Sequence, residues 1–134
     1  MFDALDIPAS ALVAQRARMD TIVGNVANID TIANKDDQNI PYRRRFVLFQ
    51  PGQAGAPDRA GVHLKSVEID QSPFRKVFDP GHRFADADGY VKYPNVDLAI
   101  EQVNMIDASR AYEANITMMD TLKGMINSTL RLLA

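Results

Sequence analysis

The sequence predicts an α+β protein, with a long helix at each end of the chain and a small β-strand and loop region between them. Near each terminus an apolar residue recurs at every seventh position, which returns side chains to nearly the same face of an α-helix. Between about Lys35 and Pro94 this spacing is lost, and proline, glycine, aspartate and β-branched residues take over. We therefore expect residues 1–34 and 96–134 to pair as a helical coiled coil, with residues 35–95 as the insert.

The N-terminal helix is predicted from a stripe of four apolar residues. Asp6 can cap the first amide groups, and Pro8 is tolerated in the first turn. Asparagine, aspartate and threonine side chains compete for backbone hydrogen bonds, so the helix is expected to end within residues 25–31. The stripe consists of Leu5, Leu12, Met19 and Val26.

The insert contains three segments with strand character. The run Phe46–Phe49 predicts a buried strand, and the alternation from Val62 to Asp70 predicts a strand with one buried face. A further short extended segment is expected around residues 74–78, and residues 86–97 are expected to form a loop.

The C-terminal helix is predicted from a second, longer apolar stripe. It spans about 50 Å at 1.5 Å per residue, which is more than a small insert can cover. An isolated chain would expose much of this stripe, and such exposure marks an interface. The sequence therefore predicts a protein that assembles with copies of itself or with partners. The stripe consists of Leu98, Met105, Tyr112, Met119, Ile126 and Leu133.

Composition excludes several classes of protein. The chain has 134 residues, 46% of them hydrophobic, which is enough apolar surface to fold or assemble. The net charge of −2 argues against a protein built mainly to bind a phosphate backbone. Cysteine is absent, so thiolate chemistry and disulfides are excluded. No apolar run reaches membrane-spanning length, and the N-terminus lacks the features of a cleavable secretory signal, so direct membrane insertion is not expected.

One loop contains alternating carboxylates that resemble the start of a calcium site. Asp86 and Asp88 have the required spacing, but Val91 stands where the obligatory glycine belongs and Tyr90 where a third oxygen ligand belongs. A plain Asp-rich turn is therefore the favoured interpretation.

The histidines and serines do not form a recognisable catalytic motif. His63 and His82 lie far apart in sequence and lack zinc-ligand spacing, and no nucleophile elbow or phosphate loop is present. We expect no enzymatic activity, metal or cofactor. A small enzyme that uses Asp86 and Asp88 with His82 is the alternative.

The most basic segment of the chain is Arg43–Arg45, which lies between two aromatic residues. Arginine beside aromatic rings can bind single-stranded nucleic acid, which makes a small nucleic-acid-binding module a second alternative. In an acidic chain, pairing with carboxylates of a neighbouring subunit, or with Asp36 and Asp37, is the favoured interpretation. We therefore expect no nucleic-acid partner.

The exit of the first helix resembles a family signature. Residues 25–31 match the pattern Asn-x-Ala-Asn-x-x-Thr, with Asn25, Asn28 and Thr31 at its polar positions. This pattern is similar to that of the axial proteins of the bacterial flagellum, which form the rod, the hook and the hook-associated structures. Further blocks in family order resemble the proximal rod members in particular: residues 41–50, 79–82, 85–91, 93–97, 104–105 and 108–115.

The resemblance implies a structural subunit of the rod, the drive shaft that carries motor torque to the hook. It implies export from the cytoplasm by the flagellar type III apparatus and assembly in the basal body with copies of itself, other rod proteins and the adaptor between ring and rod. Another axial rod subunit is the nearest alternative. The two stripes, the Asn25–Thr31 exit, the arginine run and the Asp86, Asp88 and Asn95 side chains are then expected at contacts between subunits.

Overall fold

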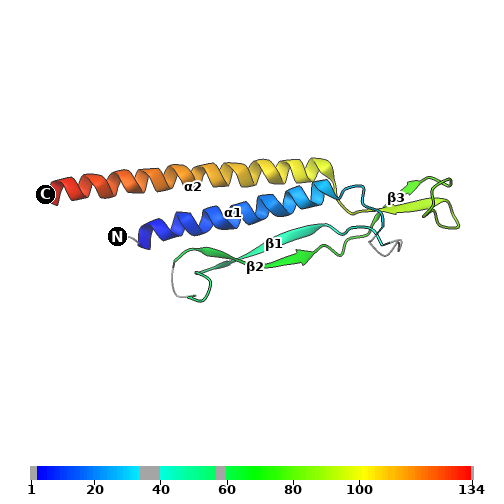
Figure 1. The fold of residues 1–134 in the computed structure, drawn as a ribbon, viewed down its shortest axis with the longest axis horizontal. Helices are drawn as coiled ribbons and strands as arrows, with labels where there is room; N and C mark the ends of the chain where they lie inside the picture. Colours follow the sequence, from blue (N-terminus) through cyan, green and yellow to red (C-terminus); the bar gives the residue numbers. More distant parts are fainter. Residues whose placement is uncertain (1–2, 34–39, 57–59, 134) are drawn as a thin grey trace.

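The computed structural model describes residues 3–33, 40–56 and 60–133. Helix α1 (Asp3–Ala27) and helix α2 (Leu98–Leu133) lie side by side and run antiparallel (Figure 1). Between them, the described residues form four short strands in two separate two-stranded antiparallel sheets. The predicted α+β fold, with long terminal helices and a small strand region between them, is confirmed.

Helix α1 begins earlier than the sequence suggested. Its first residue is Asp3 rather than a position next to Asp6, and Pro8 lies inside the helix, where it is buried. Proline lacks an amide hydrogen, so Pro8 removes one hydrogen bond near the start of the helix. Burial of its ring offsets part of that loss.

The apolar stripe of α1 is half-buried, and the most buried residues of this helix lie beside it. Ala14 and Ile22 are 2% and 5% exposed, while Leu12 and Val26 are only partly covered. The reason is that α1 packs against both α2 and the first sheet, so burial is deepest between those two contacts.

The first sheet is a twisted hairpin of β1 (Arg45–Pro51) and β2 (Val62–Ile69). Its register shifts at Leu48 and Phe49, which pair with Ser66 and Leu64 and leave Lys65 as the extra residue of a β-bulge. The bulge explains how apolar residues at even positions (Val62, Leu64) and at odd positions (Val67, Ile69) share one face.

The prediction that residues 46–49 form a buried strand was correct for the strand and wrong for its burial, because Leu48 is 38% exposed. An isolated two-stranded ribbon has little core of its own, and this one is covered by a single helix.

The hairpin lies along one side of α1 (Figure 1), and side chains of the helix bond backbone groups of both strands. The backbone N–H of Val62 in β2 donates to Ser10 Oγ (3.1 Å). At the other end of α1, the side chain of Asn25 bonds both backbone groups of Arg45 in β1. Figure 1 shows the two strands crossing along the helix, as expected for a strongly twisted ribbon.

The second sheet forms an arm, which we define as β3 (Arg75–Phe78), β4 (Tyr90–Tyr93) and the turn between them. The arm lies beyond the end of the helix pair (Figure 1). Strand β4 falls within the predicted 86–97 loop, so that part of the prediction is corrected. Fully buried Val91 anchors this strand, and Gly89 (φ 81°) provides the left-handed residue before it.

Helix α2 begins and ends where the sequence predicted. Asp97 caps its first turn by accepting from the N–H groups of Ala99 (2.8 Å) and Ile100 (3.3 Å). With 36 residues against 25 in α1, α2 extends about 16 Å past the start of α1 at 1.5 Å per residue. Within the described residues, no helix is long and apolar enough to span a membrane.

Candidate assembly site

A buried polar junction joins the helix pair to the first hairpin, and Asn25 is at its centre. Asn25 Oδ1 accepts from the Arg45 N–H (2.9 Å) and the Tyr42 hydroxyl (3.0 Å). Asn25 Nδ2 donates to the Arg45 carbonyl (2.7 Å) and to Glu101 Oε2 (3.0 Å). Since Asn25 is fully buried within the subunit, the structure does not place it on a contact surface between subunits. The amide instead completes the open edge of β1, as a neighbouring strand would.

Glu101 supplies the charge of the polar junction. Its carboxylate is fully buried in the first turn of α2, and Oε1 accepts from Arg44 Nε at 2.6 Å. Removing one partner of such a pair leaves an uncompensated buried charge. Arg44 is therefore bonded within the subunit, and its predicted contact with a neighbouring subunit stays a prediction.

Asn95 and Arg43 join the connecting segments to the same junction. Asn95 Oδ1 accepts from the Arg44 N–H (2.8 Å), and its amide nitrogen donates to the carbonyls of Asp70 and Ser72. Arg43 bonds the same two carbonyls. Arg43 and Asn95, like Arg44, thus have bonds within one subunit, and their expected contacts between subunits stay predictions.

Two acidic groups at the junction titrate away from their ordinary ranges. Hydrogen bonds from Ser72 lower the pKa of the Asp70 carboxyl, and the charge of Arg44 lowers it further. Burial raises the pKa of the Tyr42 phenol; Arg45 partly counters this effect, while Glu101 adds to it. Both shifts favour the forms that make the hydrogen bonds near neutral pH. These are the charged Asp70 carboxylate and the neutral Tyr42 hydroxyl.

The remaining signature residues shape the exit of α1. Asn28 Nδ2 donates to the Gly24 carbonyl (2.8 Å), and Thr31 Oγ1 donates to Asn28 Oδ1 (3.2 Å). The Thr31 carbonyl then accepts from the Tyr42 N–H (3.0 Å). The signature therefore ends the helix and directs the chain toward β1.

The predicted α2 stripe is one half of the face that packs on α1. We call this face the inner stripe. The two end residues of the predicted stripe, Leu98 and Leu133, are 45% and 78% exposed and do not belong to it. The other half of the inner stripe includes fully buried Glu101 and Ala108. The inner stripe consists of Glu101, Met105, Ala108, Tyr112, Asn115, Met119 and Leu122; Ile126 of the predicted stripe lies past the start of α1.

A second set of apolar residues, which we call the outer stripe, lies on a different flank of α2. Ile100 and Met118 are eighteen residues apart, about five full turns, and Met125 and Leu132 follow at two-turn intervals. Each member is more than half exposed in the subunit. The outer stripe consists of Ile100, Val103, Met118, Met125 and Leu132.

The other predicted contact residues lie at the surface. Asp86 Oδ1 accepts from the N–H groups of Asp88 and Tyr90, as in the favoured Asp-rich turn. Asp88 and Arg45 are exposed, and Arg45 stacks over the Tyr42 ring at 5.6 Å. Asp36 and Asp37, the alternative partners of the arginine run, lie outside the described residues.

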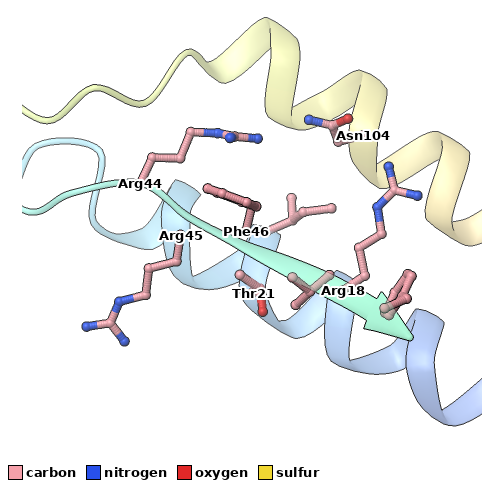
Figure 2. Close-up of a pocket in the computed structure, with 9 residues that line it drawn as sticks. Arg18, Thr21, Arg44, Arg45, Phe46 and Asn104 are labelled. Atoms are coloured by element: carbon pink, nitrogen blue, oxygen red, sulfur yellow. The ribbon is translucent and has the colours of Figure 1, made fainter. Parts of the chain in front are cut away.

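A cavity of about 290 Å³ lies between α1, β1 and α2. Figure 2 shows Arg18 extending from α1 toward Asn104 on α2, while Arg45 points away from Arg44. None of the nine described residues that line the cavity is a carboxylate or a histidine, the side chains that most often serve as general bases. No cluster of three metal-ligating side chains occurs in the described parts of the chain.

Sequence reasoning missed Glu101, the outer stripe and the contact between Ser10 and Val62. Glu101 had a detectable signal, because it stands three residues after Leu98 and seven before Ala108, on the face of α2 that should be apolar. A charge at such a position indicates a buried partner.

Comparisons with known proteins agree with this architecture. Residues 87–132 match the family model described as "Flagellar basal body rod FlgEFG protein C-terminal". The flagellar basal-body rod protein FlgC of Salmonella typhimurium is 43% identical over 132 residues, covering 98% of this chain and 97% of that protein. FlgC of Bacillus subtilis is 39% identical over 145 aligned positions, and FlgC of Borreliella burgdorferi is 38% identical over 150.

This chain is a structural protein of the flagellar basal-body rod and not an enzyme. The two long terminal helices, the exposed apolar stripe and these similarities define that class. Within that class, the chain belongs to the FlgC family. It is located in the basal-body rod and assembles with other rod components.

Proposed function

We propose that this chain is a subunit of the proximal rod and contacts its neighbours through the outer stripe of α2. It would reach the rod through the flagellar type III export apparatus and join copies of itself, other rod proteins and the adaptor between ring and rod. The observation that carries the proposal is the exposure of Ile100, Val103, Met118, Met125 and Leu132 along one helix flank. Apolar area of this extent stabilises a complex when a partner covers it.

The division of α2 into two stripes supports this role. The inner stripe is used within the subunit, which gives each subunit a stiff helix pair. The outer stripe is left for other subunits, and its length allows many weak contacts to act in parallel. A shaft that transmits torque needs both properties.

Deletion of the gene tests the proposed role. We expect non-motile cells that form the membrane ring but lack rod and hook. Normal swimming with intact hooks would contradict the proposal.

Two adjacent methionines test which face of α2 binds neighbours. Met118 belongs to the outer stripe and is 51% exposed, whereas Met119 faces α1. We expect Met118→Asp to leave the unfolding of the purified chain unchanged and to reduce its amount in isolated basal bodies at least tenfold. Met119→Asp should destabilise the subunit itself, by about 2 kcal/mol, because it places a charge in the helix pair.

The matched control is Asn127→Asp, which adds the same charge to an exposed position outside both stripes. Normal incorporation of Met118→Asp would show that the outer stripe is not the contact surface.

A further inference from the structure

We propose that one face of the arm binds a carboxylate-bearing surface of a neighbouring rod subunit, an inference that rests on the proposed function. The register of the arm places Lys76 opposite Lys92 and Phe78 opposite Tyr90. Side chains that alternate along paired strands and lie opposite one another share a face. We call these four residues the arm face.

The two lysines of the arm face form an unfavourable pair. Like charges directly opposite each other destabilise an antiparallel sheet. Both side chains are exposed, and neither forms an ion pair with any of the described residues. A carboxylate bound between the two ammonium groups would remove the repulsion, so the pair favours an anionic partner.

The two aromatic rings provide an ordered apolar anchor beside the lysines. Phe78 is 64% and Tyr90 is 41% exposed, and their rings meet edge to face with centroids 5.3 Å apart. A Cβ added at Gly89 would lie 3.0 Å from the Phe78 ring, so this ring packs closely against the glycine. Exposed aromatic residues held in this way are typical of the central contacts in protein interfaces.

The opposite face of the arm is already used inside the subunit. Val91 is fully buried there, and the guanidinium group of Arg75 lies 5.4 Å from the centroid of the Tyr93 ring. Because the arm projects beyond the helix pair (Figure 1), its free face is available to a neighbour.

Charge complementarity identifies the kind of partner. The chain contains 17 acidic and 15 basic residues. On α2, Glu113 and Asp120 lie two turns apart on one exposed flank, without an ion pair to any described residue. A neighbouring subunit of similar composition therefore presents suitable carboxylates.

Charge reversal in the full-length chain tests the proposal. We expect the double variant Lys76→Glu/Lys92→Glu to fold and be exported normally but to be at least tenfold depleted from isolated basal bodies. The variant Lys76→Arg/Lys92→Arg keeps the charge and should be incorporated normally. Lys65→Glu, on an exposed position of β2, is the matched control and should also be incorporated.

A photo-crosslinker identifies the surface that the arm contacts. Phe78→benzoylphenylalanine, irradiated in isolated basal bodies, should crosslink to a rod-protein peptide that contains aspartate or glutamate. Normal incorporation of the glutamate variant, equal loss of the arginine variant, or crosslinking only to lipid, glycan or peptides without carboxylates would overturn the proposal. Failure of the proposed function is distinguishable, since the wild-type chain would then be absent from basal bodies.

Discussion

At the scale of single residues, the side chain of Asn25 connects α1, β1 and α2 through four hydrogen bonds. The signature that contains Asn25 was visible in the sequence, but the role of Asn25 in joining these elements was not. Sequence alone placed Asn25 at the end of a helix, where its amide was expected to face another subunit. Its burial depends on Arg45 and Glu101, which lie 20 and 76 positions away. Local pattern carries no information on contacts of that range.

Replacing Asn25 by leucine should strongly destabilise the subunit. The substitution leaves the Arg45 N–H and carbonyl, the Tyr42 hydroxyl and a Glu101 oxygen without their present partner. Each unsatisfied buried group costs about 1–3 kcal/mol, so we expect a loss of at least ~3 kcal/mol in the free energy of unfolding in urea. Asn127→Leu at an exposed position should change it by less than about 0.5 kcal/mol. Equal effects of the two substitutions would contradict the assignment of Asn25.

Asp70 gives the stability of the subunit a specific pH dependence. Its pKa is lowered in the folded state, chiefly by Ser72, so folding favours the charged form. The stabilisation is present above about pH 4, the ordinary range of an unfolded aspartate, and is lost as pH falls through the lower folded pKa. Asp70→Asn should therefore be less stable than wild type at pH 7 and approach it at about pH 2. A difference independent of pH would contradict this account.

At the scale of elements, the helices were predictable and the sheets were only partly so. The predicted stripe of α2 has an apolar residue at each seventh position from Leu98 to Leu133, which fixed the bounds of the helix. The outer stripe was overlooked because Asp107, Ala114 and Thr121 interrupt it at heptad positions after Ile100. Strand β4 was missed because its four residues depend on pairing with β3. The bulge at Lys65 changes which residues of β2 share a face, and simple alternation in the sequence does not reveal that change.

Gly61 tests the contact between α1 and the first hairpin. Its φ of 138° is rarely adopted by other residues, and an added Cβ would lie 2.8 Å from Ser10 Oγ. We expect Gly61→Ala to cost about 2 kcal/mol of unfolding free energy. Gly55→Ala introduces backbone strain (φ 78°) in open space and should cost less. A smaller effect at Gly61 than at Gly55 would show that the helix and hairpin are not held closely at this point.

At the scale of the whole molecule, the subunit is an elongated body whose parts have separate roles. The helix pair gives stiffness, the polar junction fixes the first hairpin to the helices, and the arm extends beyond them (Figure 1). The family resemblance and the fold class were both accessible from sequence. The division between contacts within the subunit and contacts with its neighbours was not accessible, because it depends on which stripe of α2 packs against α1.

Methionine oxidation in intact basal bodies is the most direct test of this separation. In the free subunit, Met118 and Met125 are 51% and 61% exposed, and hydrogen peroxide should convert both to sulfoxide faster than half-buried Met105 and Met119. In isolated basal bodies, we predict that mass spectrometry will find Met118 and Met125 protected to the level of Met119. Equal oxidation of Met118 and Met125 in the free and the assembled protein would contradict the account, because the outer stripe would then face solvent in the rod.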